Sequence, residues 1–507
     1  MDLFQKYVIE PVRYCIDVFV DRNAFYIAGE YYTYRQFGEA VDVKRAEICD
    51  REENIIPLEI RDDLETYATI FACWFENKAY VPINPTWPTE RKENILGLLK
   101  NTPLPPSRGD GEEESPSRVD GGEESPSRGD EGEDLPSRGN GKGELAYILF
   151  TSGSTGVPKG VAISRKNVGA FMDSFWKTGI TIDENDRCLQ CFDLTFDVSI
   201  QSFLVALTRG ACVYTVPYNQ VKYLSVASLI HEQHITFGAM APSILTYLRP
   251  YFSELDASAF KTCILTAEAC PVDLIEEWQQ CAKNVEVYDF YGPTEATVYC
   301  TYYKCSADNN LSVNGMVSIG KPMANVTAVI VDEERNIITE DGVKGELWVA
   351  GDQVTQGYWN NEEKNREVFS YLEVDGKNKR FYHTGDLCYW DVSGNIMYVG
   401  RIDQQVKVQG FRVELSEIEY HARSFYQNEA RVAAIAYRNE HQLHEIALFV
   451  EKTAEPSDSL ISYLKEKMPQ YMMPSRVIYL DRFPQNSSDK IDRWNLRQIL
   501  KDIKRLS

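Results

Sequence analysis

One loop of the sequence has the residue types needed to bind a phosphate group. The apolar run at 146–150 leads into residues 151–160, which read TSGSTGVPKG. Small residues let backbone N–H groups approach an anion closely, hydroxyl groups add donors, and Lys159 supplies positive charge. The loop lacks the GxxxxGK[ST] spacing of a Walker loop. Flexible linkers have a similar composition, so the phosphate-binding interpretation depends on the other motifs.

Further short motifs combine turn glycines with charged or aromatic residues. They are AYVPINPTWPTER at 79–91, FYGPTE at 290–295, GELWVAGDQVTQGYWN at 345–360, HTGDL at 383–387, GRIDQQVKVQGFRVELSEIE at 400–419 and FPQNSSDKIDRWNL at 483–496. With the loop at 151–160, their order and spacing resemble the adenylate-forming superfamily. This superfamily includes acyl-CoA synthetases, luciferases and the amino-acid adenylation domains of nonribosomal peptide synthesis. The resemblance covers essentially the whole chain apart from one repeat segment.

The resemblance implies that a substrate carboxylate attacks the α-phosphate of ATP, giving an acyl adenylate and pyrophosphate. Negative charge accumulates on phosphorus oxygens in the transition state, so the site needs fixed cations. By resemblance, the catalytic residues are Glu295, which holds Mg²⁺, Thr294, which contacts phosphate, and Lys490. Lys490 is expected to bridge the substrate carboxylate and the ribose or phosphate oxygens.

The expected ATP-binding residues lie in the loop and in three later motifs. By resemblance, Tyr291 stacks on adenine, Asp386 accepts both ribose hydroxyls, and Arg401 adds a ribose contact. Taken singly, a Glu after Pro-Thr is more often a turn or cap residue, and a C-terminal Lys is more often solvated. Their joint occurrence favours the catalytic interpretation. The expected ATP-binding set is Thr151, Ser152, Gly153, Ser154, Thr155, Gly156, Lys159, Tyr291, Asp386 and Arg401.

The motif FDVS at 196–199 indicates the class of acid. Amino-acid-activating members of the superfamily have an Asp here that holds the substrate ammonium. A buried carboxylate is costly without such a partner, so Asp197 favours an amino acid as substrate. By resemblance, the substrate pocket consists of Asp197, Val198, Gln201, Ser243, Leu265, Ala267, Phe290, Val298 and Tyr299, with Lys490 on the carboxylate.

The residues expected around the substrate side chain carry no formal charge, which disfavours a charged side chain. Phe290 and Tyr299 are large and are expected to shrink the pocket. The Asp-Val-Gln start, with Ala267 and Val298, resembles the proline-type pattern, whereas Ser243, Phe290 and Tyr299 depart from it. L-Proline is therefore the first candidate among small neutral amino acids.

The chain departs from the family pattern at several other positions. Asp289 stands where Asn is usual, Gln409 where Arg is usual, and Ser416 where Gly is usual. Ser488 and Asp489 replace the usual Asn-Gly before the catalytic lysine. A carboxylate at this point either favours the charged form of Lys490 or misdirects it, and the sequence leaves both readings open.

Two residues of the motif at 400–419 are expected to serve the second half-reaction. The family rotates its small domain between adenylation and thiol attack, and Asp403 occupies the position of the hinge. By resemblance, Gly410 lies on the loop that lines the pantetheine tunnel in the thioester-forming state. A simple turn glycine is the alternative reading of Gly410.

An α/β fold of helix and sheet layers must hold these motifs in place. Short apolar strands such as ITFGAMA and GELWVAG alternate with longer mixed segments that fit helices. The region after residue 400 has the pattern of a separate α+β unit. We expect a large N-terminal adenylate-forming domain of residues 1–102 and 144–402, and a small mobile C-terminal lid domain of residues 403–507.

Residues 103–143 form an insertion of a different composition. The triplet PSR recurs at Pro106, Pro116, Pro126 and Pro136, and Gly, Asp and Glu fill the intervals. Such a decapeptide cannot bury enough surface to offset its ordering entropy, so we expect a disordered loop. Two RGD strings within it suggest adhesion, but expansion of a repeat in a tolerated surface loop explains them more simply.

Composition and charge exclude several classes of protein. The chain has 507 residues, of which 43% are hydrophobic, enough for a substantial core. Lys and Arg number 53 against 76 Asp and Glu, and a net charge of −23 argues against nucleic acid as the general partner. No apolar stretch approaches the ~20 residues of a membrane span. We expect a cytoplasmic protein with neither a signal peptide nor a membrane partner.

The twelve cysteines are scattered, as is typical of free buried thiols in a reducing compartment. Cys188 and Cys191 form a CxxC, but no second pair or nearby His completes a zinc site. No metal is therefore expected apart from Mg²⁺ on Glu295.

The acceptor of the activated acid is expected to be a separate protein. The chain ends seventeen residues after Lys490 without a carrier or condensation module. We expect transfer to the phosphopantetheine thiol of a discrete carrier protein in nonribosomal peptide-type biosynthesis. The alternatives are a D-alanine–carrier protein ligase of cell-wall modification, an acyl-CoA synthetase for a non-amino acid, and a catalytically inactive binding protein.

Overall fold

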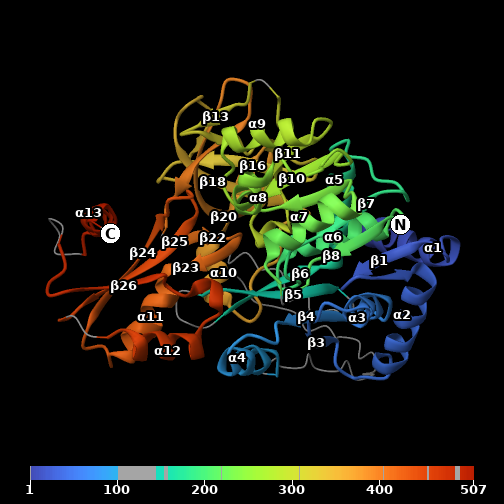
Figure 1. Ribbon diagram of the computed structural model, residues 1–507, viewed down its shortest axis with the longest axis horizontal. Coiled ribbons are helices and arrows are strands. Elements are labelled where there is room, and N and C mark those ends of the chain that lie inside the picture. Colours follow the sequence, from blue (N-terminus) through green and yellow to red (C-terminus); the bar gives the residue numbers. More distant parts are fainter. Residues whose placement is uncertain are drawn as a thin grey trace, which may run out of the picture.

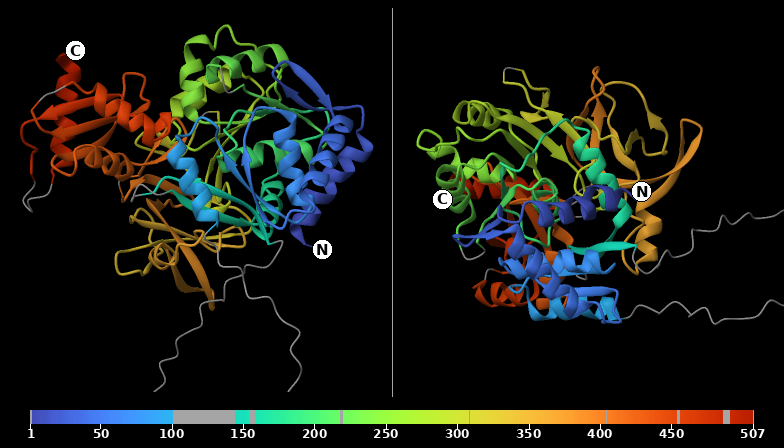
Figure 2. Two further views of the ribbon diagram at one scale, coloured as in Figure 1. Left: turned by 90° about the horizontal axis from the view of Figure 1, so that it is seen from below. Right: turned by 90° about the vertical axis from the view of Figure 1, so that its right-hand side faces the viewer.

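The protein consists of a large N-terminal domain and a small C-terminal domain, which confirms the expected α/β class. Figure 1 shows a computed structural model that describes residues 2–100, 144–153, 158–217, 220–307, 309–403, 405–453, 456–485 and 491–506. Below, the described residues up to 403 are called the body, and those from 405 onward the C-terminal unit. The repeat segment 103–143 lies outside the described residues. In Figure 2 the C-terminal unit stands on one side of the body.

The largest sheet of the body has nine strands in the order β15-β12-β11-β10-β9-β7-β8-β1-β2. The strands from β1 through β8, β7, β9 and β10 to β11 pair in parallel. Four of these strands, β7 to β10, are buried almost throughout, as expected for a sheet covered on both faces. The bounds are β1 Asn23–Ile27, β2 Glu30–Thr33, β7 Arg187–Gln190, β8 Cys212–Thr215, β9 Phe237–Met240, β10 Thr262–Thr266, β11 Glu286–Tyr291, β12 Thr301–Lys304 and β15 Lys321–Pro322.

Two further sheets complete the body. A four-stranded sheet, β3-β4-β5-β6, carries the candidate phosphate loop between β5 and β6. A six-stranded antiparallel sheet, β17-β16-β18-β20-β19 with β21 on β20, carries the HTGD motif in the long strand β20. The bounds are β3 Ile55–Glu59, β4 Ala79–Ile83, β5 Leu145–Thr151, β6 Lys159–Ser164, β16 Val326–Val331, β17 Ile337–Ile338, β18 Gly345–Gly351, β19 Phe369–Val374, β20 Lys377–Trp390 and β21 Ile396–Arg401, and a separate pair consists of β13 Ser312–Val313 and β14 Met316–Val317.

Some helices of the body begin at a side-chain cap. Thr33 and Ser164 form capping boxes at the starts of α2 and α5, and Asp63 caps α3. These caps fix where β2 and β6 end and where the helices turn back over the sheets. The bounds are α1 Glu10–Val18, α2 Tyr34–Ile48, α3 Leu64–Phe75, α4 Thr89–Lys100, α5 Arg165–Trp176, α6 Asp197–Leu207, α7 Lys222–Gln233, α8 Pro242–Leu248, α9 Val272–Cys281 and α10 Glu362–Val368, with one-turn helices at Gln5–Ile9, Arg249–Tyr251 and Thr294–Ala296.

The C-terminal unit has its own hydrophobic core. A three-stranded sheet, β24-β25-β26, packs against α11 and α13, and the two-stranded hairpin β22–β23 points toward the body (Figure 1). The bounds are β22 Gln405–Val408, β23 Phe411–Glu414, β24 Arg431–Arg438, β25 His444–Glu451, β26 Arg476–Leu480, α11 Leu415–Phe425, α12 Asp458–Lys467, α13 Arg493–Leu506 and a one-turn helix Gln470–Met472.

The cysteines are free thiols, and most are buried as predicted, whereas Cys49 is exposed and Cys281 is partly buried. Cys188 and Cys191 are both buried, and the described residues contain no group of three or more His, Cys, Asp or Glu side chains arranged to hold a metal ion. No helix within the described residues has both the length and the apolar character needed to cross a membrane.

Candidate functional site

The predicted nucleotide motifs meet around a cavity of about 600 Å³ between the body and the C-terminal unit. Its walls come from the ends of β10 and β11, from Asp386 within β20, from β21 and from the hairpin β22–β23, together with residues of α8, β24, β25 and α13. Sequence-predicted residues in the wall are Ser243, Ala267, Phe290, Tyr291, Asp386, Arg401 and Asp403. Glu268, Asp289 and Lys407 line the same cavity. The motifs at 290–295, 383–387 and 400–403 therefore form one site.

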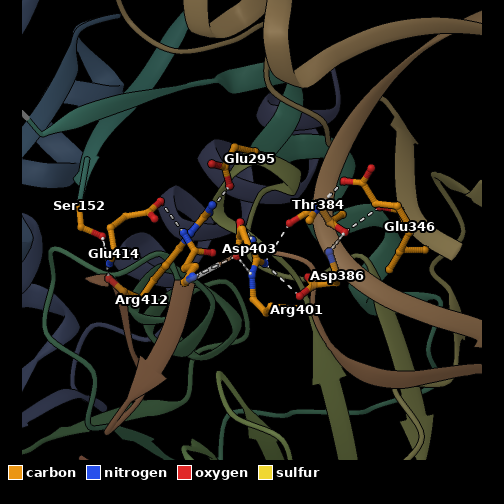
Figure 3. A network of polar contacts seen from close by, with 12 residues as sticks. Ser152, Glu295, Glu346, Thr384, Asp386, Arg401, Asp403, Arg412 and Glu414 are labelled. Atoms are coloured by element: carbon orange, nitrogen blue, oxygen red, sulfur yellow. Dashed lines mark hydrogen bonds and ion pairs between the residues drawn. The ribbon is translucent and has the colours of Figure 1, made fainter. Parts of the chain in front are cut away.

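A network of Asp386, Arg401 and Asp403 forms one end of the cavity (Figure 3). Strand pairing places Asp386 opposite Arg401, and the Arg401 Nη1 atom donates to Asp386 Oδ1 at 2.9 Å. The Arg401 Nε and Nη2 atoms donate to the two Asp403 oxygens at 2.7 and 2.6 Å. Burial alone would raise the pKa of Asp403, but Arg401 holds it below its usual value. Tyr291 donates to the second oxygen of Asp386. A carboxylate, a guanidinium and an aromatic ring suited to a nucleoside thus lie together.

Glu295 is a fully buried carboxylate that stays ionised. The Arg412 Nη1 atom lies 2.7 Å from Glu295 Oε2, and the Tyr358 hydroxyl donates to Oε1 at 2.5 Å. Burial opposes ionisation, yet the Arg412 charge and these hydrogen bonds lower the pKa of Glu295 to about 2. An ionised carboxylate oxygen is the ligand type that Mg²⁺ prefers, so Glu295 fits the predicted metal-binding role. In this arrangement Arg412 neutralises Glu295.

The described part of the phosphate loop contacts the C-terminal unit. The Ser152 hydroxyl donates to the Arg412 carbonyl at 3.0 Å and accepts from the Glu414 N–H at 3.2 Å (Figure 3). Lys159 lies 3.3 Å from Glu414, while burial lowers the pKa of the Lys159 ammonium. The Gly153 N–H donates to Glu417 at 2.9 Å. Of the predicted loop, Ser154, Thr155 and Gly156 lie outside the described residues, as does Lys490.

Asp197 is a buried carboxylate that is not part of the cavity lining. It begins α6, and its side chain lies beside Thr294. Burial raises the pKa of Asp197 to about 6, and the Thr294 hydroxyl and the Lys407 ammonium partly offset that rise. A buried carboxylate with a raised pKa is stabilised by a ligand that carries positive charge.

The predicted side-chain pocket divides into two groups. Ser243, Ala267 and Phe290 line the cavity, whereas the others are buried and are not part of its lining: Asp197, Val198, Gln201, Leu265, Val298 and Tyr299. The Tyr299 hydroxyl donates to Gln201 Oε1 at 3.3 Å, and the rings of Phe290 and Tyr299 lie 4.9 Å apart. Within the described chain, Gln201 Nε2 is buried without a hydrogen-bond partner.

Glycine is required at two points of the site. A Cβ on Gly292 would lie 2.3 Å from the Val298 carbonyl oxygen, so only glycine fits between β11 and the turn that carries Glu295. Gly410, at the tip of the hairpin β22–β23, has a φ of +83°, which favours glycine. Its N–H donates to Glu268 at 2.6 Å, and Glu268 also accepts from the Ser243 N–H at 3.0 Å. Glu268 therefore joins the hairpin tip to the predicted substrate pocket.

The sequence reasoning missed Glu268, Lys407 and Arg412. Lys407 and Arg412 are paired across the hairpin, and both belong to the motif at 400–419. Alternation along β22 and β23 puts these two cations on one face, a signal that the sequence did contain. Burial lowers the pKa of Lys407, although the nearby Asp386 opposes that change. No local pattern indicates Glu268, because its partner Gly410 lies 142 residues away in the sequence.

Asp289, one of the departures from the family pattern, lines the cavity as a buried carboxyl group. Burial raises its pKa well above the usual value. Among the residues that the structure describes, Asp289 Oδ1 finds no hydrogen-bond partner. The cavity wall thus offers an unused polar atom to a ligand.

The comparisons with known proteins agree with these motifs. Residues 14–359 match the family model described as AMP-binding enzyme. The chain is 32% identical over 482 residues to tyrocidine synthase 3 of Brevibacillus parabrevis, and 30% identical over 480 residues to bacitracin synthase 1 of Bacillus licheniformis. Each alignment covers 93% of this chain but only 7% and 9% of the relatives, so the chain spans a small part of their length.

Solved structures share the fold. The Vibrio cholerae adenylation domain AlmE, in complex with glycyl-adenosine-5'-phosphate, has a TM-score of 0.81 at 23% identity, covering 97% of both chains. PA1221, a protein containing adenylation and PCP domains, has a TM-score of 0.78 at 20% identity, covering 98% of this chain and 85% of that chain.

Proposed function

The chain belongs to the AMP-binding enzyme family, in its nonribosomal peptide synthetase adenylation type, and we propose that it activates a small neutral amino acid with ATP. The carrying observation is that the Asp386–Arg401 pair and Lys407 line one cavity. The buried Asp197 lies near Lys407 and Thr294, and the ionised Glu295 is bound by Arg412 of the hairpin that contains Lys407. The product of the first step is an aminoacyl adenylate. The acceptor in the second step is a phosphopantetheine thiol on a separate carrier protein.

In the first step, an oxygen of the amino-acid carboxylate attacks the α-phosphorus of ATP, and the bond to the pyrophosphate leaving group breaks. Asp386 accepts the ribose hydroxyls, and the ring of Tyr291 stacks on adenine. The unpartnered Asp289 oxygen is available to a donor on the base. Lys159 and the N–H groups of the loop bind the departing phosphates. Glu295 would hold Mg²⁺, which would supply positive charge to offset the negative charge that develops in this step.

Lys490 is assigned to the bridge between the substrate carboxylate and the nucleotide. An ammonium on a flexible stem suits the charge that develops at these oxygens. Thr294 contacts the phosphate from the turn that carries Glu295.

The substrate assignment rests on Asp197. Its carboxylate pairs with the ammonium of the amino acid, and the pocket supplies uncharged groups for the side chain. L-Proline is the first candidate, because Asp197, Val198 and Gln201 resemble the proline-type pattern. The glycyl adenylate bound to AlmE supports a small substrate for this fold.

In the second step, the thiol sulfur attacks the aminoacyl carbon, its proton leaves to solvent, and the bond to AMP breaks. Gly410 lies at the hairpin tip beside the cavity, where the arm of a carrier would enter. The PCP domain of PA1221 supports a carrier as acceptor. A D-alanine–carrier protein ligase remains the rival assignment of substrate and pathway, and an acyl-CoA synthetase remains the rival assignment of acceptor.

The contacts of the hairpin also support a hinge at Asp403. Arg412 pairs with Glu295 and Glu414 pairs with Lys159, so the hairpin occupies groups assigned to Mg²⁺ and phosphate. Binding of ATP must displace those contacts. The arrangement in Figure 1 therefore suits the second step, and rotation at Asp403 would open the site for the first.

The test is amino-acid-dependent exchange of pyrophosphate into ATP, measured across the twenty amino acids and D-alanine. Exchange with one or a few small neutral amino acids is expected, and it should disappear in Lys490→Ala. If amino acids are inert while a simple carboxylic acid supports exchange, the proposal is wrong and the acyl-CoA synthetase reading replaces it. Exchange with D-alanine alone would favour the cell-wall ligase.

A further inference from the structure

The tip of the hairpin β22–β23 is a two-residue turn that is pressed against the body. Val408 pairs with Phe411, and the two residues between them, Gln409 and Gly410, have φ values of +51° and +83°. Positive φ at both central residues is the pattern of a type I′ turn, which fits the twist of a hairpin. Gly410 is buried and lies outside the strand pairing, so its N–H needs an acceptor from elsewhere.

The acceptor is the carboxylate of Glu268, which joins the two parts of the molecule. Glu268 Oε1 accepts from the Gly410 N–H at 2.6 Å, and Oε2 accepts from the Ser243 N–H at 3.0 Å. Glu268 follows β10 and Ser243 lies at the start of α8, so both belong to the body. One oxygen of the carboxylate therefore binds the C-terminal unit, while the other binds the wall of the predicted substrate pocket.

An ionised carboxylate is the group that suits these two contacts. Burial raises the pKa of Glu268, but the N–H groups of Ser243 and Gly410 oppose that rise. The ammonium of Lys407, which lines the same cavity from the hairpin, also lowers the pKa of Glu268. A carboxamide could not replace the carboxylate fully, because it has one acceptor oxygen and its NH₂ group would face an N–H donor.

Apolar contacts bring the hairpin tip to the same place. A Cβ on Gly410 would lie 3.5 Å from the Ala241 Cβ and 3.8 Å from the Ala267 Cβ, so the tip packs closely on the body. On the other side, the ring of Phe411 lies 4.6 Å from the ring of Phe196, the residue that precedes α6. Apolar contacts of this kind are not directional, whereas the hydrogen bond to Gly410 fixes the position of the tip.

We propose that Glu268 is a positioning residue for the aminoacyl transfer step. Its carboxylate holds the hairpin tip against the substrate pocket and so keeps Lys407 in the cavity during transfer. In this role Glu268 acts through the hairpin and not on the reacting atoms. The inference rests on the proposed function, because it assigns the docked hairpin to the second step. Loss of the carboxylate should therefore slow transfer more than adenylation.

The test measures both half-reactions in the full chain and in Glu268→Gln, which keeps the size of the side chain. Single-turnover transfer from preformed aminoacyl adenylate to pantetheine should slow at least about tenfold relative to pyrophosphate exchange, since a hydrogen bond to a charged group is lost. The matched control is Asp289→Asn, which changes a buried carboxyl group of the same cavity. Its ratio of transfer to exchange should stay within about twofold of that of the unmodified chain. Equal slowing of both half-reactions in Glu268→Gln would overturn the inference.

Hydrogen exchange of the backbone amides tests the contact without any activity. In the substrate-free chain, the Gly410 amide should exchange at least about tenfold faster in Glu268→Gln than in the unmodified chain or in Asp289→Asn. Unchanged protection of the hairpin would overturn the inference. So would a loss of protection that extends to β24 and β25, because Glu268 would then only maintain the fold. Absence of pyrophosphate exchange in the unmodified chain would instead refute the proposed function.

Discussion

The buried ion pair between Arg91 and Glu417 gives a prediction about the order of the two half-reactions. Arg91, on α4 of the body, donates from Nη1 to Glu417 Oε1, on α11 of the C-terminal unit, at 2.9 Å. Their side chains are 2% and 0% exposed. The second oxygen of Glu417 accepts from the Gly153 N–H. This pair exists only while the C-terminal unit sits as in Figure 1.

The size of the effect follows from burial. Removing one partner of a buried ion pair costs about 3–5 kcal/mol, because the other charge is left unpaired. A destabilisation of about 3 kcal/mol lowers the population of this arrangement by up to about 100-fold. Arg91→Met, which keeps the volume, should therefore slow aminoacyl transfer to a carrier or pantetheine by that factor. Pyrophosphate exchange should stay within about threefold, since we propose that adenylation uses another orientation of the C-terminal unit.

The assay is a double-mutant cycle. Two measurements are made on each variant: single-turnover transfer from preformed aminoacyl adenylate, and pyrophosphate exchange. The variants are Arg91→Met, Glu417→Gln and the double variant. The double variant should be less impaired in transfer than the sum of the single effects, because the charges act as a pair. Equal losses in both half-reactions would show that the pair only maintains the fold. No loss in transfer would refute the assignment of this arrangement to the second step.

Three further predictions concern charge and the insertion. Burial raises the pKa of Asp197 to about 6. The ionised fraction of this carboxyl group therefore decreases as the pH drops below 6. The KM for the amino acid in exchange should then rise about tenfold per pH unit as pH falls below 6, whereas a KM flat to pH 5 would exclude ammonium pairing. Arg412→Leu leaves the buried Glu295 carboxylate unpaired, so Tm should fall at pH 7, and Mg²⁺ with ATP should restore part of it; an unchanged Tm would contradict the pairing. Deletion of residues 103–143 should leave exchange within a few-fold, and near-total loss would show that this segment is structural.

Much of the nucleotide site was predictable, because short motifs contain both the chemistry and the strands that hold it. Asp386 and Arg401 meet because β20 and β21 pair within one local hairpin. Glu295 follows β11 directly, and Gly292 is needed at that turn. Local sequence was sufficient to find these residues.

Contacts between distant segments were not predictable from the same reasoning. Arg91 and Glu417 are 326 residues apart, and neither residue type shows which partner it will find. Tyr299 is fully buried against Phe290 and lies outside the lining of the cavity, and its expected effect on the size of the substrate pocket stays a prediction.

The central claim is that the site recognises an amino acid through its ammonium group at Asp197. The most direct measurement compares pyrophosphate exchange with the preferred amino acid, proline first, and with the matching acid that lacks the amine, cyclopentanecarboxylate in that case. We predict that the amino acid supports exchange and that kcat/KM for the amine-free acid is at least about 100-fold lower. The reason is that the amine-free acid cannot make the charge-assisted contact to the buried Asp197 carboxylate. Equal exchange with both acids would contradict the claim.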